Sequence, residues 1–194
     1  ESFQAIRTML ERKLIPQDKL IDVLTQFAAL AQGAGEHTPK SLEAIQKMLT
    51  KNLIPEDKLV GVLTQFAALA QGAGDDTPKS LEVIHELLTK KFIPEDKLVD
   101  VLALAQGNGL KPFEFLEIIQ VMLTKKLIPD DRLVETLNAI ALEFLKLREE
   151  TGDYADEFFE VIKTVLQENL ISKDKLVVTI TLLVPEFIKI YKGA

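Results

Sequence analysis

The sequence predicts an all-α protein of about ten helices, arranged as five helical hairpins that stack in an α-solenoid or a curled bundle. Three observations predict this class. One tripeptide recurs in a common frame, apolar residues recur at spacings of three and four, and the alternating pattern of strands is lacking. A single hairpin has an uncovered apolar face, so stacking on the next hairpin is what would bury it.

The recurring tripeptide defines the repeat frame. It stands at Leu14–Pro16, Leu53–Pro55, Phe92–Pro94, Leu127–Pro129 and, as "LIS", at Leu170–Ser172, with third residues 39, 39, 35 and 43 apart. An ungapped comparison of residues 1–39 with residues 40–78 gives 26 identities in 39 positions, which indicates recent duplication or deliberate design. We expect one helical-repeat domain over residues 1–194, with units 1–37, 38–76, 77–110, 111–151 and 152–194.

The second unit illustrates the first helix of each hairpin. Thr38 is expected to cap a helix that begins at Pro39, where proline's missing amide hydrogen costs nothing. The spacing predicts a helix to about Asn52. The expected apolar face consists of Leu42, Ile45, Leu49 and Leu53.

The second helix of this hairpin is expected to start after Pro55. Acidic residues follow in the first turn, where the helix dipole favours negative charge. Gly72 is expected to end the helix in the left-handed conformation. The predicted apolar stripe consists of Leu59, Val62, Leu63, Phe66, Ala67 and Ala70.

The third and fourth units depart from this pattern. Units three, four and five open at Thr77–Pro78, Lys111–Pro112 and Gly152–Asp153. The second helix of the third unit lacks the "TQFA" of its neighbours, which shortens it by about one turn. The fourth unit has a longer second helix that continues to Gly152. A short helix beside a long one predicts a step in the stack.

The predicted step has two interpretations. Phe27 and Phe66 have no counterpart in the short helix, so nearby rings either fold into the step and fill it or leave an apolar notch. Such a notch would suit a lipid-like molecule or a partner helix. Its candidate residues are Phe66, Leu104, Phe113, Phe115, Ile140 and Phe144.

Small residues form a second stripe on the repeated second helix. They are Gly61, Thr64, Ala68 and Gly72 in the second unit, and the first unit has Asp22, Thr25, Ala29 and Gly33 at the same positions. This spacing is typical of close helix packing, and the alternative is a lining for a concave surface.

The carboxyl-terminal third is apolar on more than one helix face. Either its helices are surrounded by others or an exposed face binds something apolar, and an apolar terminal repeat favours fold-back or self-association. Pro185 is expected to bend or end the last helix near Val184. The apolar stretch Leu176–Tyr191 is too short and too polar to span a membrane, so a buried helix is expected.

Composition excludes several functional classes. The net charge of −7 and pI near 5.0 predict a soluble chain and argue against nucleic acid as a partner. The absence of cysteine excludes disulfides and thiolate chemistry, and it leaves the compartment open. The lack of an initiator methionine before Glu1 is compatible with a processed or secreted protein, or with an excised fragment.

Catalytic and metal-binding patterns are scarce. His37 lies in an expected loop and His85 at an expected solvent-facing position, so the two make a poor metal site and a poor acid–base pair. We therefore expect no catalytic residues, no metal site and no required cofactor.

The unit size and hairpin form resemble tetratricopeptide and HEAT-type repeats, without the tryptophan, glycine and tyrosine pattern of the former. The leading functional hypothesis is a non-enzymatic scaffold that presents a surface to a protein partner or to itself. The alternative is a carrier of an apolar small molecule, such as a lipid or pigment, near the shortened third hairpin and the phenylalanine-rich carboxyl-terminal helices. A further alternative is an engineered repeat without a natural function.

Overall fold

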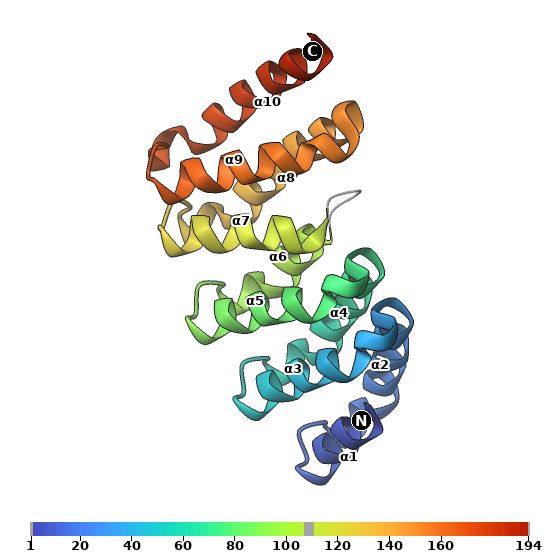
Figure 1. The fold of residues 1–194 in the computed structure, drawn as a ribbon. Coiled ribbons are helices and arrows are strands. Elements are labelled where there is room, and N and C mark those ends of the chain that lie inside the picture. The colour runs from blue at the N-terminus through green and yellow to red at the C-terminus, as the bar shows by residue number, and fades with distance from the viewer. Residues whose placement is uncertain (1, 107–110, 194) are drawn as a thin grey trace. The chain divides into compact units, whose positions relative to one another are not determined.

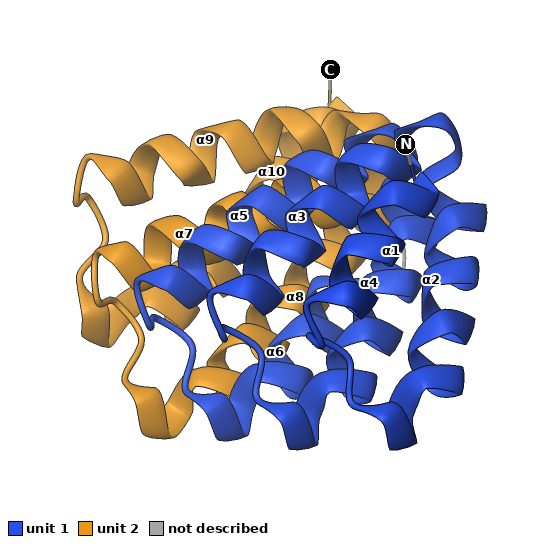
Figure 2. Ribbon diagram, turned by 90° about the horizontal axis from the view of Figure 1, so that it is seen from below, with its two compact units in different colours: residues 1–106 blue, residues 107–194 orange. Residues whose placement is uncertain are grey.

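The computed structural model describes residues 2–106 and 111–193. Throughout these residues the regular elements are α-helices and short 3-10 helices, without a strand, so the predicted all-α class is confirmed (Figure 1). The chain divides into two compact units, residues 1–106 and residues 107–194, coloured separately in Figure 2. The single repeat domain expected over residues 1–194 stays a prediction.

Unit 1 contains helices α1 to α6. The elements in chain order are α1 (Ser2–Glu11), η1 (Gln17–Lys19), α2 (Leu20–Ala34), η2 (Gly35–His37), α3 (Thr38–Thr50), η3 (Glu56–Lys58), α4 (Leu59–Ala73), η4 (Gly74–Asp76), α5 (Thr77–Thr89), η5 (Glu95–Lys97) and α6 (Leu98–Ala105). Helix α1 packs on α3 and α3 on α5, while α2 packs on α4 and α4 on α6. Each helix pair of unit 1 therefore covers an apolar face of the pair that follows.

Unit 2 contains helices α7 to α10. Its elements are α7 (Pro112–Thr124), η6 (Asp130–Arg132), α8 (Leu133–Thr151), η7 (Gly152–Tyr154), α9 (Ala155–Gln167), η8 (Lys173–Lys175) and α10 (Leu176–Gly193). Helix α7 packs on α9 and α8 packs on α10. The two units thus use the same kind of contact, between helices that are two apart in the chain.

Each odd-numbered helix is followed by a residue in the left-handed conformation. The backbone φ is between 51° and 56° at Lys13, Asn52, Lys91, Lys126 and Asn169. The amide of Asn52 donates to the Leu49 carbonyl at 3.0 Å and the amide of Leu53 donates to the Met48 carbonyl at 3.0 Å, which are the two bonds of a Schellman motif. The expected helix end near Asn52 is corrected to Thr50, because a left-handed residue cannot continue a right-handed helix.

The recurring tripeptide completes this turn. Its first residue supplies the amide of the longer bond, as Leu53 does after α3. Its isoleucine is buried in every copy: Ile15, Ile54, Ile93, Ile128 and Ile171. Its last residue is extended, with ψ of 141° at Pro55 and 153° at Ser172, and starts the next 3-10 helix. The tripeptide therefore ends one helix, buries an isoleucine in the core and begins the next 3-10 helix.

Replacing Lys91 by glycine is expected to raise the free energy of unfolding by about 1 kcal/mol. A residue with a Cβ loses about 1–2 kcal/mol in the left-handed conformation, and the greater freedom of glycine in the unfolded chain offsets part of the gain. Lys90→Gly is the control, since Lys90 has φ of −83° and no strain to relieve. Urea unfolding of both variants checks the expectation, and stabilisation by Lys90→Gly would contradict it.

Two expected helix caps are wrong. Gly72 lies within α4, and the left-handed glycine is Gly74, with φ of 51°, whose amide still bonds to the Ala70 carbonyl. Thr38 is the first residue of α3, and its hydroxyl donates to the Gly35 carbonyl at 2.6 Å. The reason is the 3-10 turn η2, which already places Thr38 in helical conformation and occupies its amide.

The helix lengths follow the repeat variations. Helix α6 has 8 residues where α2 and α4 have 15, and α8 has 19, so the predicted short and long helices are confirmed. Residues 107–110, which include the predicted end of the short helix, lie outside the described residues. Helix α10 continues through Pro185 to Gly193, so the expected end near Val184 is wrong, whereas the alternative, a bend at Pro185, stays a prediction. Proline removes only one helix hydrogen bond, and the following residues resume the pattern.

The small-residue stripe includes one close helix contact. A Cβ atom added at Gly33 on α2 would lie 2.5 Å from the backbone carbon of Ala70 on α4. At Gly61 the nearest side-chain atom, Cγ2 of Val99 on α6, would lie at an ordinary 3.5 Å. Close packing of α2 on α4 therefore requires glycine at residue 33 but not at residue 61.

Candidate functional site

The residues of the predicted notch are divided between the two units. Phe66 on α4 is fully buried and Leu104 on α6 is half-buried, both in unit 1. In unit 2, Phe113 is half-buried, while Phe115, Ile140 and Phe144 are buried. The notch that would combine all six residues stays a prediction.

The phenylalanines of unit 2 pack against one another. The ring of Phe144 on α8 lies 5.9 Å from Phe115 on α7, and 6.3 Å and 5.0 Å from Phe158 and Phe159 on α9, between ring centroids. Phe158 also meets Phe187 on α10 at 5.0 Å. Edge-to-face and tilted pairs of this kind stabilise a core beyond the area they bury.

This aromatic cluster leaves no room for a ligand at its centre. The narrow gap among Lys111, Phe115, Ile118, Phe144 and Phe159 is too small to hold a water molecule. Small-molecule sites usually have a volume of roughly 300–1,000 Å³. Within unit 2 the rings fill the space between the helices, and both interpretations of the step beside the short helix stay predictions.

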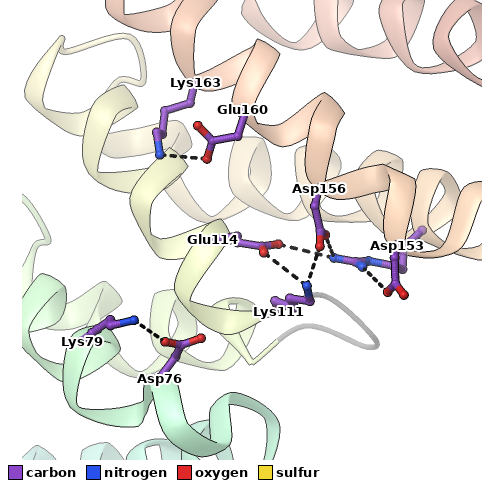
Figure 3. A network of polar contacts seen from close by, with 9 residues as sticks. Asp76, Lys79, Lys111, Glu114, Asp153, Asp156, Glu160 and Lys163 are labelled. Carbon is purple, nitrogen blue, oxygen red and sulfur yellow. Dashed lines mark hydrogen bonds and ion pairs between the residues drawn. The ribbon is translucent and has the colours of Figure 1, made fainter.

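A charged network lies beside the aromatic cluster and joins three helices (Figure 3). Arg148, in the last turn of α8, pairs with Asp156 on α9, with Glu114 on α7 at 3.4 Å and with Asp153 in η7 at 3.6 Å. Lys111, just before α7, also bonds to Asp156. The Arg148 side chain is only 12% exposed, and its guanidinium lies 5.5 Å from the Phe159 ring centroid.

The network shifts its two main carboxyls in opposite directions. Burial, together with the charge of Asp156, raises the pKa of Glu114. Burial alone would also raise the pKa of Asp156, but hydrogen bonds and charges from Lys111 and Arg148 outweigh it, so that pKa is lowered. Asp156 is therefore the carboxylate that holds the cations, and the network connects α7, α8 and α9 as a tie between helices.

The two histidines belong to unit 1 and have other contacts than this network. His37 in η2 approaches Asp75 at 3.6 Å and Glu36 at 3.9 Å. The His85 Nε2 atom on α5 lies 3.1 Å from the Lys51 Nζ atom. Burial and the charges of Lys51 and Lys47 lower the pKa of His85, so its imidazole is neutral when it accepts a hydrogen bond from Lys51.

Three surface grooves recur beside the tripeptide linkers. We call them linker grooves, because each lies between two successive linkers. The first has a volume of about 420 Å³ and is lined by Lys13, Leu14, Pro16, Leu49, Asn52, Ile54, Pro55, Glu56 and Leu59. The second has about 250 Å³ and is lined by Asn52, Leu53, Leu88, Lys91, Ile93, Pro94, Glu95 and Leu98.

The third linker groove is in unit 2 and is larger, about 650 Å³. It separates the α7–α8 linker and the start of α8 from the start of α10. Its lining residues are Leu127, Pro129, Arg132, Glu135, Thr136, Ala139, Lys173, Asp174, Leu176, Val177 and Val178. The volume is in the range of binding pockets for small molecules or single side chains.

The linker grooves share one chemical plan. Leucine and proline side chains line the interior, and both signs of charge stand at the rim, as with Lys91 and Glu95. The charges have a structural reason of their own, since cations favour helix carboxyl termini and anions favour amino termini. Sequence reasoning found the tripeptide but missed the grooves, although the recurring basic–apolar–acidic order was a visible signal.

Comparison with models of protein families, with curated proteins and with solved structures gives no match. Among the described helices, none is both long enough and apolar enough to cross a membrane. Within residues 2–106 and 111–193, no group of three or more His, Cys, Asp or Glu side chains is placed to hold a metal ion.

Proposed function

We propose that the chain is a non-enzymatic helical-repeat scaffold, an α-solenoid whose linker grooves bind an extended segment of a partner polypeptide. The observation that carries the proposal is that the first two grooves are lined by residues 39 apart in the sequence, while a third groove lies beside the α7–α8 linker. The two neighbouring grooves of unit 1 suit a partner that is itself extended and repeats its contacts. The aliphatic interior would accept apolar side chains, and the mixed rim would bind polar backbone and charged groups.

The frame also suggests the spacing of the partner's contacts. Packed helices lie about 8–10 Å apart, and an extended chain advances about 3.3 Å per residue. A segment crossing successive linker grooves would therefore place an apolar side chain in a groove at about every third residue. This expectation distinguishes the proposal from nonspecific binding to an apolar surface. Nonspecific binding would select apolar peptides without a regular spacing of their apolar residues.

Selection from a displayed library of unstructured peptides tests the proposal on the full chain. We expect enriched peptides with apolar residues three apart. Ala139→Phe, which fills the third linker groove, should weaken their binding at least tenfold, about 1.4 kcal/mol. The control is Asn138→Phe, which adds the same ring at the neighbouring exposed position outside the groove. Equal binding by both variants, or enrichment without a period, would overturn the proposal.

The carrier hypothesis receives less support. The aromatic cluster has no internal space, so an apolar small molecule in unit 2 would have to occupy the third linker groove instead. Mass spectrometry of the purified protein under native conditions distinguishes the two functions. A co-purifying apolar compound that Ala139→Phe displaces would favour the carrier over the scaffold.

A further inference from the structure

We propose that copies of this chain associate head to tail, with the outer face of α1–α2 of one copy covered by the outer face of α9–α10 of another. The argument concerns the helix faces at the two ends of the fold and is independent of the linker grooves. It rests on exposed apolar residues, most of which have buried counterparts elsewhere in the repeat frame, whereas the counterparts of Ile21 and Leu182 are half-buried.

The first helix pair exposes a face that the second pair buries. Phe3, Leu10, Ile21 and Leu24 are exposed on α1 and α2, and we call them the amino-terminal face. Phe3 is 87% exposed, whereas its counterpart Leu42, 39 residues later, is 1% exposed. The Leu24 side chain is likewise exposed, at 37%, whereas its counterpart Leu63 is 1% exposed. In the second pair the equivalent positions are covered by α1 and α2, so the amino-terminal face has the composition of a helix-pair interface.

The last helix pair exposes the complementary side. We call Val161, Leu182, Leu183 and Ile190 on α9 and α10 the carboxyl-terminal face. In the repeat frame, 156 residues earlier, Leu183 corresponds to Phe27 and Ile190 to Ala34, which are both buried where α3 and α4 follow. Ile190 itself is 70% exposed. This face therefore has the composition of the side that a following helix pair covers.

The register of the internal contacts predicts how the two faces meet. Odd-numbered helices pack on odd-numbered ones and even on even, in both units. In the proposed contact α9 of one copy would lie on α1 of the next, and α10 on α2. Each internal contact joins the trailing side of one pair to the leading side of the next, and the proposed contact between copies is heterologous in the same way.

Charge complementarity favours this pairing over two amino-terminal faces. Residues 2–13 carry Arg7, Arg12 and Lys13 against one carboxylate, Glu11. Residues 157–168, beyond the Asp156 of the charged network, carry Glu157, Glu160 and Glu168 against one cation, Lys163. Opposite net charges attract across a contact, whereas two copies of α1 would bring like charges together. Lys163 on α9 already bridges to Glu117 on α7 at 3.0 Å, so cross-helix ion pairs occur between packed odd-numbered helices.

Sedimentation of the full chain over a range of concentrations tests the proposal. We expect the wild type to form dimers and longer oligomers as concentration rises, and to dissociate as salt is added. Two variants interrupt one face each: Phe3→Glu/Ile21→Glu at the amino-terminal face and Leu182→Glu/Ile190→Glu at the carboxyl-terminal face. These side chains are exposed, so the helical fold is retained, and circular dichroism checks this. Each variant alone should associate at least tenfold more weakly.

Sedimentation of a mixture of the two variants is the decisive measurement. One variant keeps an intact carboxyl-terminal face and the other an intact amino-terminal face, so an equimolar mixture should form dimers and no larger species. Leu142→Glu, an exposed position on α8 outside both faces, is the control and should behave as wild type. A wild type that stays monomeric, or association lost in the amino-terminal variant but retained in the carboxyl-terminal one, would overturn the proposal.

Discussion

Gly33→Ala is expected to lower the free energy of unfolding by about 3 kcal/mol, near the upper end of the usual range for overpacking. The added methyl group would lie 2.5 Å from the Ala70 carbonyl carbon and 2.6 Å from the Gln71 nitrogen. Both are backbone atoms and cannot rotate away, so α2 and α4 would have to separate. Chemical unfolding followed by circular dichroism measures the loss.

Gly61→Ala provides the matched control on the following helix. Its methyl group would meet only a side-chain atom of Val99 at 3.5 Å, and alanine is the better helix former by roughly 0.5–1 kcal/mol. We therefore expect the control to stabilise the protein slightly. Changes of the same sign and size in both variants would show that α2 and α4 do not approach as closely as described.

Arg148→Met is expected to lower the free energy of unfolding by about 3 kcal/mol. Methionine keeps most of the apolar contact with Phe159 but leaves Asp156 and Glu114 near each other without their shared guanidinium. The control is Arg132→Met, whose side chain is 60% exposed and pairs with Glu135 at 3.6 Å. Exposed pairs contribute little, so the control should change stability by less than about 0.5 kcal/mol.

The effect of Arg148→Met should depend on pH in a defined direction. The pKa of Asp156 is lowered in the folded state, so its contribution to stability is present above its ordinary value of 3.8 and is lost as pH falls through the folded value. The difference between wild type and variant should therefore narrow in acid. A difference that stays constant down to the acid transition would contradict a charge-based role for Arg148.

The helices were predictable because their signals are local. Apolar spacing, the tripeptide and proline at helix starts are all read within one unit, and the altered lengths of α6 and α8 follow from residues missing or added there. The helix ends were less predictable. Left-handed positions usually carry glycine or asparagine, but here Lys13, Lys91 and Lys126 occupy three of them, so the residue types at these helix ends gave no signal.

The charged network and the linker grooves depend on residues far apart in the sequence. Arg148 and Glu114 are 34 residues apart, on different helices, and only the packing of unit 2 brings them together. The shape of a linker groove likewise depends on how two neighbouring helix pairs pack, so the sequence of one pair alone does not predict it. The one available signal was the repetition of charge order around the first four tripeptides.

The side-by-side packing of α2 and α4 underlies every inference drawn from the repeat frame. The chain has no cysteine of its own, so a thiol reagent can join only the two cysteines that are introduced to test this packing. The Gln71 side-chain nitrogen donates to the Ala29 carbonyl at 3.2 Å, so Ala29→Cys/Gln71→Cys should be joined within one molecule by a short bifunctional thiol reagent. Asp22→Cys/Gln71→Cys, about 10 Å further along α2, should react far more slowly. Equal rates for the two pairs, or products formed only between molecules, would contradict the stacked arrangement.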